Sequence, residues 1–232
     1  MPSQEQAFLD WLEGWEADLP TVELEDVVAQ PENVAIVASD LIKGFCCVGP
    51  LASPRIAGII PAAVRIFEGA YGLGVDHFLL LEDTHDPDAV EFSAYPPHAV
   101  AGSEESDTID ELDTLPFSDR FTVFPKNTIS STTGTALVPW LETHPEVTTF
   151  IVVGDSTDIC VYQLAIDLRV RANVLGQEEA RIIVPAGAVQ TFDMPVETAK
   201  EVGALPHDGD LLHRVFLYHM ALNGVEVVAE LT

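Results

Sequence analysis

Residues 148–160 read TTFIVVGDSTDIC, and the pattern of this stretch decides the expected fold. The run 148–153 consists of β-branched and aromatic residues without polar alternation, which is typical of a strand buried on both faces of a parallel sheet. Gly154 ends the run, and a helical segment follows Thr157. Cys160 is therefore expected in the first turn of a helix, just beyond the carboxyl end of a buried strand.

This turn gives a cysteine a distinctive chemical setting. A helix N-terminus carries partial positive charge that favours a thiolate, and its first backbone N–H groups have no helical acceptor. One turn can therefore supply both a nucleophile and an oxyanion hole. Ser156, Thr157 and Asp158 are residue types that cap helices, and Asp158 is expected to be a cap and turn former. A buried structural cysteine is the alternative, and this stretch alone does not decide between the two.

Further apolar runs alternate with helical segments along the chain. Strands are predicted at 34–39, 78–81, 121–124, 148–153, 180–185 and 225–229, and helices at 54–73, 136–141, after 157, 195–203 and 208–222. The alternation predicts an α/β fold, a doubly wound and mostly parallel sheet of about six strands with helices on both faces. Residues 1–32 are interpreted as an N-terminal helical extension, with helices near 6–15 and 22–28, and residues 33–232 as one domain. The extension is expected to pack on that domain or on a second subunit.

The composition excludes several classes of partner. Ten Lys and Arg against 38 Asp and Glu give a formal net charge of −28, which argues against binding to nucleic acid or to anionic membranes. No apolar run reaches the ~18 residues that span a bilayer, and the start lacks the basic region of a signal peptide. Three cysteines, two of them adjacent, make no disulfide framework, so a reducing cytoplasm is the expected compartment.

Four of the predicted strands end in residues that carry chemistry. Asp40 follows the first strand, Asp83 and His85 follow the second, Lys126 follows the third and Cys160 follows the fourth. Because parallel strands bring their carboxyl ends to one edge, where ligands bind, we expect these side chains to lie together. Cys160 would be the nucleophile, Lys126 would stabilise its thiolate, and Asp40 would carry the proton. Taken singly, Asp40 could be a helix cap and Lys126 a surface lysine.

This combination of residues resembles a known family. Asp40, Lys126 and the segment GDSTDIC at 154–160 are similar to the Asp-Lys-Cys triad and the cysteine loop of the isochorismatase-like cysteine hydrolases. The similarity extends over residues 33–195. It implies the doubly wound fold of that family and hydrolysis of an amide through a cysteine thioester.

The resemblance also assigns roles around the triad. It implies a cis peptide bond between Asp155 and Ser156, and an oxyanion hole made by the backbone amides of Ser156 and Cys160. Phe45 and Tyr95 are expected to hold a pyridine ring between them in the substrate site. Asp155 is expected to line the same site, although the family usually has an apolar residue before the cis bond.

A second cluster resembles the metal site of the nicotinamidases within this family. Its members are Asp83 and His85 in an Asp-x-His pair and His98 in the motif YPPH at 95–98. Between them, Glu91 stands where these enzymes have a further ligand. The resemblance implies one divalent ion, and the donors suit Zn, Fe or Mn. The alternative is a solvated acidic loop that contains two histidines by chance.

The sequence therefore predicts a cysteine-dependent amidohydrolase of the nicotinamidase type that acts on nicotinamide or a related small amide and assembles as a homo-oligomer. One alternative is a metal-independent amidase of the same family with another small amide as substrate, and another is a non-catalytic binding member. A separate cluster, His207, Asp208, Asp210 and His213, is assigned a structural role, with Asp208 as the N-cap of the helix that follows.

Overall fold

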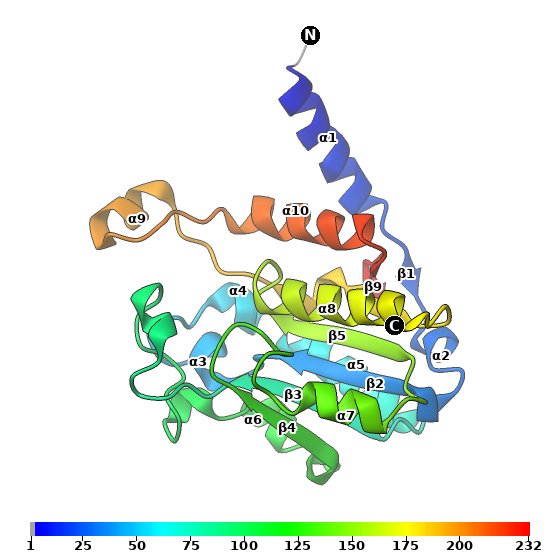
Figure 1. Ribbon diagram of the computed structural model, residues 1–232. Helices are drawn as coiled ribbons and strands as arrows, with labels where there is room; N and C mark the ends of the chain where they lie inside the picture. The colour runs from blue at the N-terminus through cyan, green and yellow to red at the C-terminus, as the bar shows by residue number, and fades with distance from the viewer. Residues whose placement is uncertain (1–2) are drawn as a thin grey trace.

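The computed structural model describes residues 3–232 and has a large parallel β-sheet at its centre (Figure 1). Its strands are β2 (Val34–Ser39), β3 (His77–Asp83), β4 (Phe121–Lys126), β5 (Thr149–Asp155), β6 (Arg181–Pro185), β7 (Val189–Gln190) and β8 (Glu226–Val228). Six of them lie in the order β4-β3-β2-β5-β6-β8, and β7 pairs with the end of β5. All of these pairings are parallel. The predicted α/β fold is confirmed.

Helices cover both faces of the sheet. They are α1 (Gln4–Ala17), α2 (Leu24–Val27), α3 (Lys43–Cys46), α4 (Pro54–Ala57), α5 (Ile60–Gly72), α6 (Asp110–Asp113), α7 (Leu137–Thr143), α8 (Cys160–Leu175), α9 (Val196–Val202) and α10 (Gly209–Leu222). One hydrophobic core lies between the sheet and α2, α5 and α6, and the other between the sheet and α7, α8 and α10. In Figure 1, α7 and α8 lie in front of the sheet and α5 lies behind it. Within residues 3–232, no helix is long and apolar enough to cross a membrane.

The position of strand β5 explains why apolar and polar residues do not alternate in its sequence. Ile151 and Val153 point into the core with α5, whereas Phe150 and Val152 point into the core with α8. Successive side chains of a strand face opposite sides, and here each side is covered by helices. Every position of β5 is therefore buried, and the apolar run follows from that.

Some elements differ from the prediction. The helix expected at 54–73 is two helices, α4 and α5, because Pro61 in the first turn of α5 has no N–H to bond back to a preceding turn. Of the helix expected at 22–28, only the short α2 forms, and strand β1 (Thr21–Val22) precedes it. Strand β1 pairs with β9 (Glu230–Leu231), so this part of the N-terminal segment is tied to the other end of the chain.

The register of the central strands determines where the functional side chains meet. Ser39 at the end of β2 is paired with Leu81 on one side and with Gly154 on the other. Asp83 at the end of β3 is paired with Lys126 at the end of β4. The carboxyl ends of β2, β3, β4 and β5 therefore form one continuous edge, as predicted for a site in this type of sheet.

Helix α1 stands out from the rest of the molecule (Figure 1). It packs on α10 through aromatic rings, with the ring centroids of Trp15 and Tyr218 5.7 Å apart. Asp208 precedes helix α10, and its carboxylate accepts the backbone N–H of Leu211 at 3.0 Å, which confirms Asp208 as the predicted N-cap. The N-terminal helix and the last long helix thus support each other on one side of the sheet.

Candidate active site

The turn that carries Cys160 lies between β5 and α8, as the sequence predicts. Gly154 has φ 113°, and a Cβ at this position would lie 2.0 Å from the carbonyl oxygen of Ser39, so only glycine allows this close approach. The peptide bond between Asp155 and Ser156 is cis, which confirms that prediction. Helix α8 then begins at Cys160, at the edge where β2, β3 and β4 also end.

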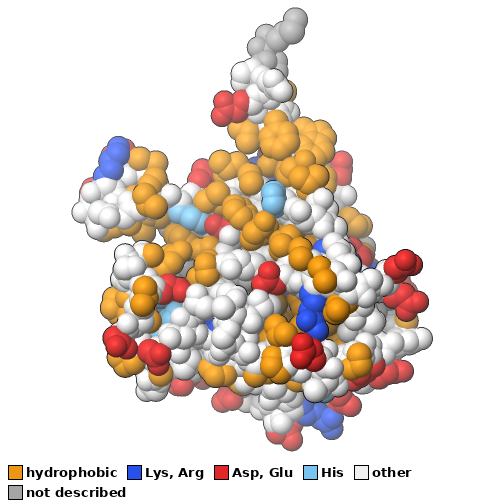
Figure 2. Space-filling model, viewed as in Figure 1, with side chains coloured by type: hydrophobic (Ala, Val, Ile, Leu, Met, Phe, Trp, Pro, Cys, Tyr) orange, Lys and Arg blue, Asp and Glu red, His pale blue; other side chains and the backbone are white. Residues whose placement is uncertain are grey.

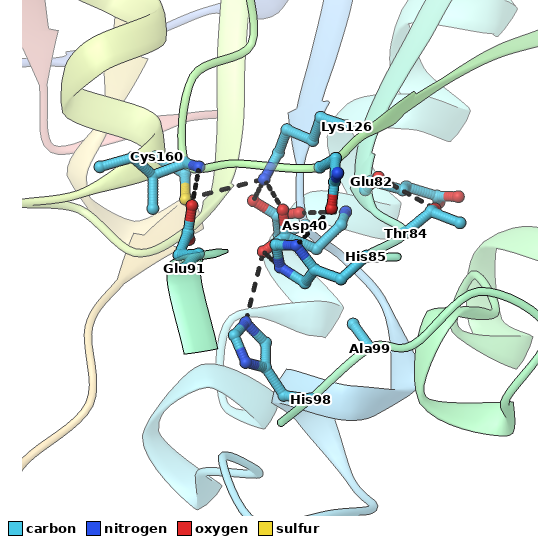
Figure 3. Close-up of polar contacts among 12 residues, drawn as sticks. Asp40, Glu82, Thr84, His85, Glu91, His98, Ala99, Lys126 and Cys160 are labelled. Atoms are coloured by element: carbon cyan, nitrogen blue, oxygen red, sulfur yellow. Dashed lines mark hydrogen bonds and ion pairs between the residues drawn. The ribbon is translucent and has the colours of Figure 1, made fainter. Parts of the chain in front are cut away.

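Charged side chains surround the thiol in the interior of the protein (Figure 3). Lys126 Nζ lies 2.8 Å from Asp40 Oδ2 and 2.5 Å from Asp83 Oδ1. The same ammonium group is 3.8 Å from Cys160 Sγ. Asp40 Oδ1 also accepts the backbone N–H of Asp83 at 2.8 Å. All of these residues are buried, so this edge of the sheet brings two carboxyl groups, an ammonium and a thiol into one buried cluster.

One positive charge between two carboxylates determines how they hold protons. Burial and the nearby Asp83 charge raise the pKa of Asp40 to about 6, although Lys126 opposes the shift. Burial would also raise the pKa of Asp83, but Lys126 and the imidazoles of His85 and His98 hold that pKa well below its usual range. Burial would lower the pKa of Lys126, yet the two carboxylates raise it well above its usual value. Asp40 is therefore the carboxyl group that can exchange a proton near neutral pH.

The protonation state of the thiol differs from the expectation. Burial raises the pKa of Cys160 well above its usual value, and the nearby Lys126 ammonium only partly offsets this. Lys126 lowers the pKa of the thiol, as predicted, but burial outweighs this effect, so the pKa is not lowered overall as the sequence pattern suggested. The sequence indicates the helix terminus and the lysine, both of which lower the pKa of a thiol. It does not indicate that the folded chain excludes solvent from the sulfur, which raises that pKa. A sulfur in this state would need a base before it could act as a nucleophile, and Asp40 is bound to the same ammonium group.

The backbone N–H groups of Ser156 and Cys160 are available to a ligand. Within the described chain, neither donates to a backbone or side-chain acceptor. Of the amides between them, Thr157 N donates to Gln190 O and Ile159 N donates to Ser156 O, each at 3.0 Å, whereas Asp158 N has no backbone acceptor in residues 3–232. Two free donors beside a thiol are what an oxyanion hole requires.

Asp83, His85 and His98 form a group whose possible ligand atoms all lie within 4.8 Å of one another. His98 Nδ1 is 2.8 Å from the carbonyl oxygen of Pro96, so Nδ1 donates to this oxygen and Nε2 is the ring atom left for a ligand. His85 Nδ1 is similarly 3.3 Å from Asn127 Oδ1. The Nε2 atoms of His85 and His98 lie 3.4 and 3.8 Å from Asp83 Oδ2. In residues 3–232, His85 Nε2 is buried without a hydrogen-bond partner. This donor set fits a divalent metal ion.

Glu91, the fourth predicted ligand, lies at the margin of this group. It is part of the short 3-10 helix Val90–Ser93, and its Oε2 accepts the backbone N–H of Ile129 at 3.2 Å (Figure 3). Its carboxylate is not among the atoms that lie within 4.8 Å of one another. The structure thus brings three of the four predicted ligands together and engages Glu91 elsewhere.

The residues expected to bind substrate lie near His98 and the buried cluster of Asp40 and Lys126. The ring centroids of Phe45 and Tyr95 lie 5.5 and 6.1 Å from that of His98. Asp155 is 1% exposed, and in the described chain its Oδ1 has no hydrogen-bond partner. Burial and the neighbouring charge of Asp40 raise the pKa of Asp155 well above its usual value. Two aromatic rings therefore lie beside His98, and the carboxyl group of Asp155 is buried with one oxygen atom unpartnered in the described chain.

The expected caps of α8 have other partners in the structure. The N-cap position is Ile159, which makes no side-chain capping bond. Asp158 Oδ2 lies 2.8 Å from His207 Nε2, and Thr157 Oγ1 lies 2.8 Å from His213 Nδ1. The prediction that Asp158 caps the helix is wrong, because a histidine 49 positions further along the chain binds its carboxylate. No spacing or motif in the sequence indicates either pair.

The comparison with protein families agrees with this geometry. The model of the isochorismatase domain matches residues 34–194, which include the cysteine turn and the ends of the four strands. The chain belongs to the isochorismatase family. This family membership confirms the resemblance seen in the sequence and makes the protein a member of a family of hydrolases.

Individual relatives extend the similarity beyond the matched domain. Nicotinamidase 1 of Arabidopsis thaliana is 27% identical over 230 residues, which are 92% of this chain and 93% of that protein. A cysteine hydrolase from Pseudomonas syringae pv. phaseolicola has a TM-score of 0.70 at 21% identity, with 85% of this chain and 89% of that chain covered. A pyrazinamidase of Pyrococcus horikoshii in complex with zinc has a TM-score of 0.63 at 17% identity, with 84% and 98% covered. At these identities the two solved structures show a shared fold.

Proposed function

We propose that the protein is a cysteine-dependent amidohydrolase that converts nicotinamide, or a closely related small amide, to the carboxylic acid and ammonia. The observation that carries the proposal is the buried contact between Cys160 Sγ and Lys126 Nζ, at 3.8 Å, beside Asp40. The similarity to a nicotinamidase along almost the whole chain supports an amide as the substrate.

The chemistry begins with the thiol. The Cys160 sulfur forms a bond to the carboxamide carbon while its proton passes to Asp40, whose pKa of about 6 suits this transfer. The negative oxygen of the tetrahedral intermediate accepts hydrogen bonds from the backbone amides of Ser156 and Cys160. Asp40 then donates the proton to the departing ammonia, and the thioester forms.

Water completes the reaction. It attacks the thioester carbon and transfers a proton to Asp40, and the proton then returns to the sulfur as the carboxylic acid leaves. Lys126 remains protonated throughout, because two carboxylates hold its charge, and it stabilises the sulfur anion as that anion develops.

Asp83, His85 and His98 would hold one divalent ion, Zn, Fe or Mn, with Glu91 as an additional carboxylate nearby. When bound, such an ion supplies a Lewis-acid centre for a ring nitrogen of the substrate or for a water molecule. The two imidazoles are already oriented, because each Nδ1 is engaged by an oxygen atom of the protein.

The substrate site combines aromatic and polar contacts. Phe45 and Tyr95 would flank a flat ring, for which aromatic side chains provide favourable stacking. Asp155 would supply a buried carboxyl group that can donate or accept one hydrogen bond. This combination favours a heteroaromatic amide over an aliphatic one.

A panel of small amides, assayed for released ammonia, tests the proposal. Nicotinamide and pyrazinamide should be hydrolysed, benzamide more slowly because it lacks a ring nitrogen, and aliphatic amides least. Hydrolysis of aliphatic or carbamoyl amides with nicotinamide untouched would instead support the metal-independent amidase. A complete lack of turnover, with tight binding of an amide, would support the non-catalytic member.

The expected assembly and compartment are part of the same proposal. Figure 2 shows hydrophobic side chains gathered where α1 rises from the body, and Phe8 and Trp11 on α1 are about half exposed. Such a surface favours a homo-oligomer, which light scattering of the purified protein would detect. The three cysteines are all free, which suits a reducing cytoplasm.

A further inference from the structure

Two histidines hold consecutive side chains of the turn that carries the proposed nucleophile. His207 contacts Asp158, and His213 contacts Thr157, each at 2.8 Å. Both histidines come from the segment after residue 194, which lies outside the part of the chain that matches the isochorismatase domain. In Figure 1 this segment, with α9 and α10, lies above α8.

His207 is held in one orientation. Its Nδ1 lies 2.9 Å from the carbonyl oxygen of Phe192, so this nitrogen donates and Nε2 is directed at Asp158. The imidazole also stacks on the ring of Phe192, with centroids 3.9 Å apart. The bridge between Met194 and His207 adds two backbone hydrogen bonds, of 2.7 and 2.8 Å. The imidazole is therefore a rigid support for the Asp158 carboxylate.

His213 has the corresponding position on the other side of the turn. Thr157, its partner, is completely buried, and His213 itself is largely buried on α10. Behind the imidazole, Glu16 of α1 has Oε1 4.0 Å from His213 Nε2 and accepts a hydrogen bond from Arg214 Nε at 2.6 Å. Helix α1 thus contacts the cysteine turn through a single intermediate side chain.

We propose that His207 and His213 are positioning residues that hold the turn in the geometry needed for the reaction. Thr157 and Asp158 lie between Ser156 and Cys160, the two residues whose amides would bind the oxyanion. A shift of their side chains therefore moves both donors and the sulfur together. Misplacement of reacting groups by about 1 Å can cost roughly 100-fold in rate, so two anchors on this turn have a direct effect on turnover.

The test uses pairs of variants of the full-length protein. His207→Leu and His213→Leu remove the contacts, whereas His207→Gln and His213→Asn keep an amide nitrogen near Nε2 and Nδ1, respectively. His219→Leu is the matched control, because His219 lies on α10 and its partners in the described chain, Tyr162 and Asn223, lie outside the turn. The measurements are kcat and KM for the amide and hydrogen–deuterium exchange of the peptide that covers 154–160.

The expected result is a loss of kcat of about tenfold or more in each leucine variant, with KM changed less than about threefold. The Gln and Asn variants should recover most of kcat, and His219→Leu should match the wild type. Exchange should accelerate in 154–160 and not across the sheet. Asp158→Asn combined with His207→Leu should lose no more than the larger single loss, because both remove the same contact.

Unchanged kcat and unchanged exchange at 154–160 in both leucine variants would overturn the proposal. Uniformly faster exchange over the whole chain, with normal kcat, would also overturn it by assigning the histidines to global stability. The kinetic part rests on the proposed function. If the wild type hydrolyses no amide, that function fails, while the exchange measurement still decides whether the two histidines order the turn.

Discussion

Lys126 and Lys200 form salt bridges of the same length in opposite environments. Lys126 Nζ lies 2.8 Å from Asp40, with both side chains fully buried, and Lys200 Nζ lies 2.8 Å from Glu197 on the exposed helix α9. An exposed pair of this kind contributes about 0–1 kcal/mol. A buried pair costs several kcal/mol of desolvation per ion, which only close partners can offset. The contribution of an ion pair to stability therefore depends on its exposure to solvent more than on the distance between the two charged groups.

The buried Lys126 has a role that the exposed Lys200 does not have. The cluster holds Asp40 and Asp83 beside a thiol, and without Lys126 these buried groups would face each other unpaired. Burying these ionisable groups together lowers the stability of the fold, but it places groups that can exchange a proton next to the thiol. The following predictions test how far the two regions differ.

The largest effect is expected at the thiol. Cys160→Ala removes the proposed nucleophile, and ammonia release from nicotinamide should fall by at least about 10⁴-fold, because the remaining groups only bind the substrate. The melting temperature should change by only a few degrees, and Cys47→Ala, at an exposed position, is the control. A Cys160→Ala protein that retains even a tenth of the wild-type rate would contradict the assignment.

Replacement of the two lysines separates the buried pair from the exposed one. Lys126→Met leaves two buried carboxylates without a cation, so we expect a loss of about 3–5 kcal/mol in the free energy of unfolding. Turnover should also fall by about 100-fold or more. Lys200→Met should change stability by less than about 0.5 kcal/mol. Urea unfolding of both variants measures the two losses of stability. Similar losses would contradict the difference expected between the buried and the exposed pair.

Metal content tests the neighbouring group at the same sheet edge. The purified protein should contain about one divalent ion per chain by elemental analysis, and His98→Ala should weaken metal binding by more than about tenfold. Chelation should stop nicotinamide hydrolysis while the far-ultraviolet circular dichroism stays unchanged, because the sheet and its two cores do not depend on the ion. His144→Ala, which changes a histidine that follows α7 and packs on Trp140, should keep the metal. Full activity with no bound metal would rule out this role for the loop.

The last prediction concerns the dependence of stability on pH. The pKa of Asp155 is raised in the folded state, so above about pH 4 the unfolded chain releases this proton while the native protein keeps it. Rising pH therefore lowers the stability of the wild type, and Asp155→Asn should remove this loss. The stability difference between the two proteins should grow by up to about 1.4 kcal/mol per pH unit above that point.

Urea unfolding at pH 5, 6 and 7 measures this difference, with the exposed Asp88→Asn as the control. A constant difference across the three pH values would mean that Asp155 is ionised in the folded protein.

Much of the site follows from local sequence patterns. The apolar run at 148–153 predicts a strand covered on both faces, and the alternation of such runs with helices predicts a parallel sheet. In that type of sheet, residues that follow the strands must meet at one edge, whatever lies between them. Asp40, Lys126 and Cys160 could therefore be placed together from the sequence, even though their separations along the chain exceed 30 residues.

Other features depended on contacts that no local pattern encodes. The pKa of Cys160 is raised because the folded chain removes water from around the sulfur, and burial is a property of the packed structure. Glu91 is engaged by the amide of Ile129, which a motif match does not reveal. Asp158 and Thr157 look like helix caps in the sequence, yet His207 and His213 bind them across about 50 residues of chain.

The sequence by itself thus determined the sheet and the edge at which Asp40, Lys126 and Cys160 meet, because strand periodicity and chain direction are local properties. Only the tertiary structure decided the proton on the sulfur, the partners of the cysteine turn and which of the predicted metal ligands converge. Those depend on solvent exclusion and on hydrogen bonds between distant segments, and both arise only when the layers have packed.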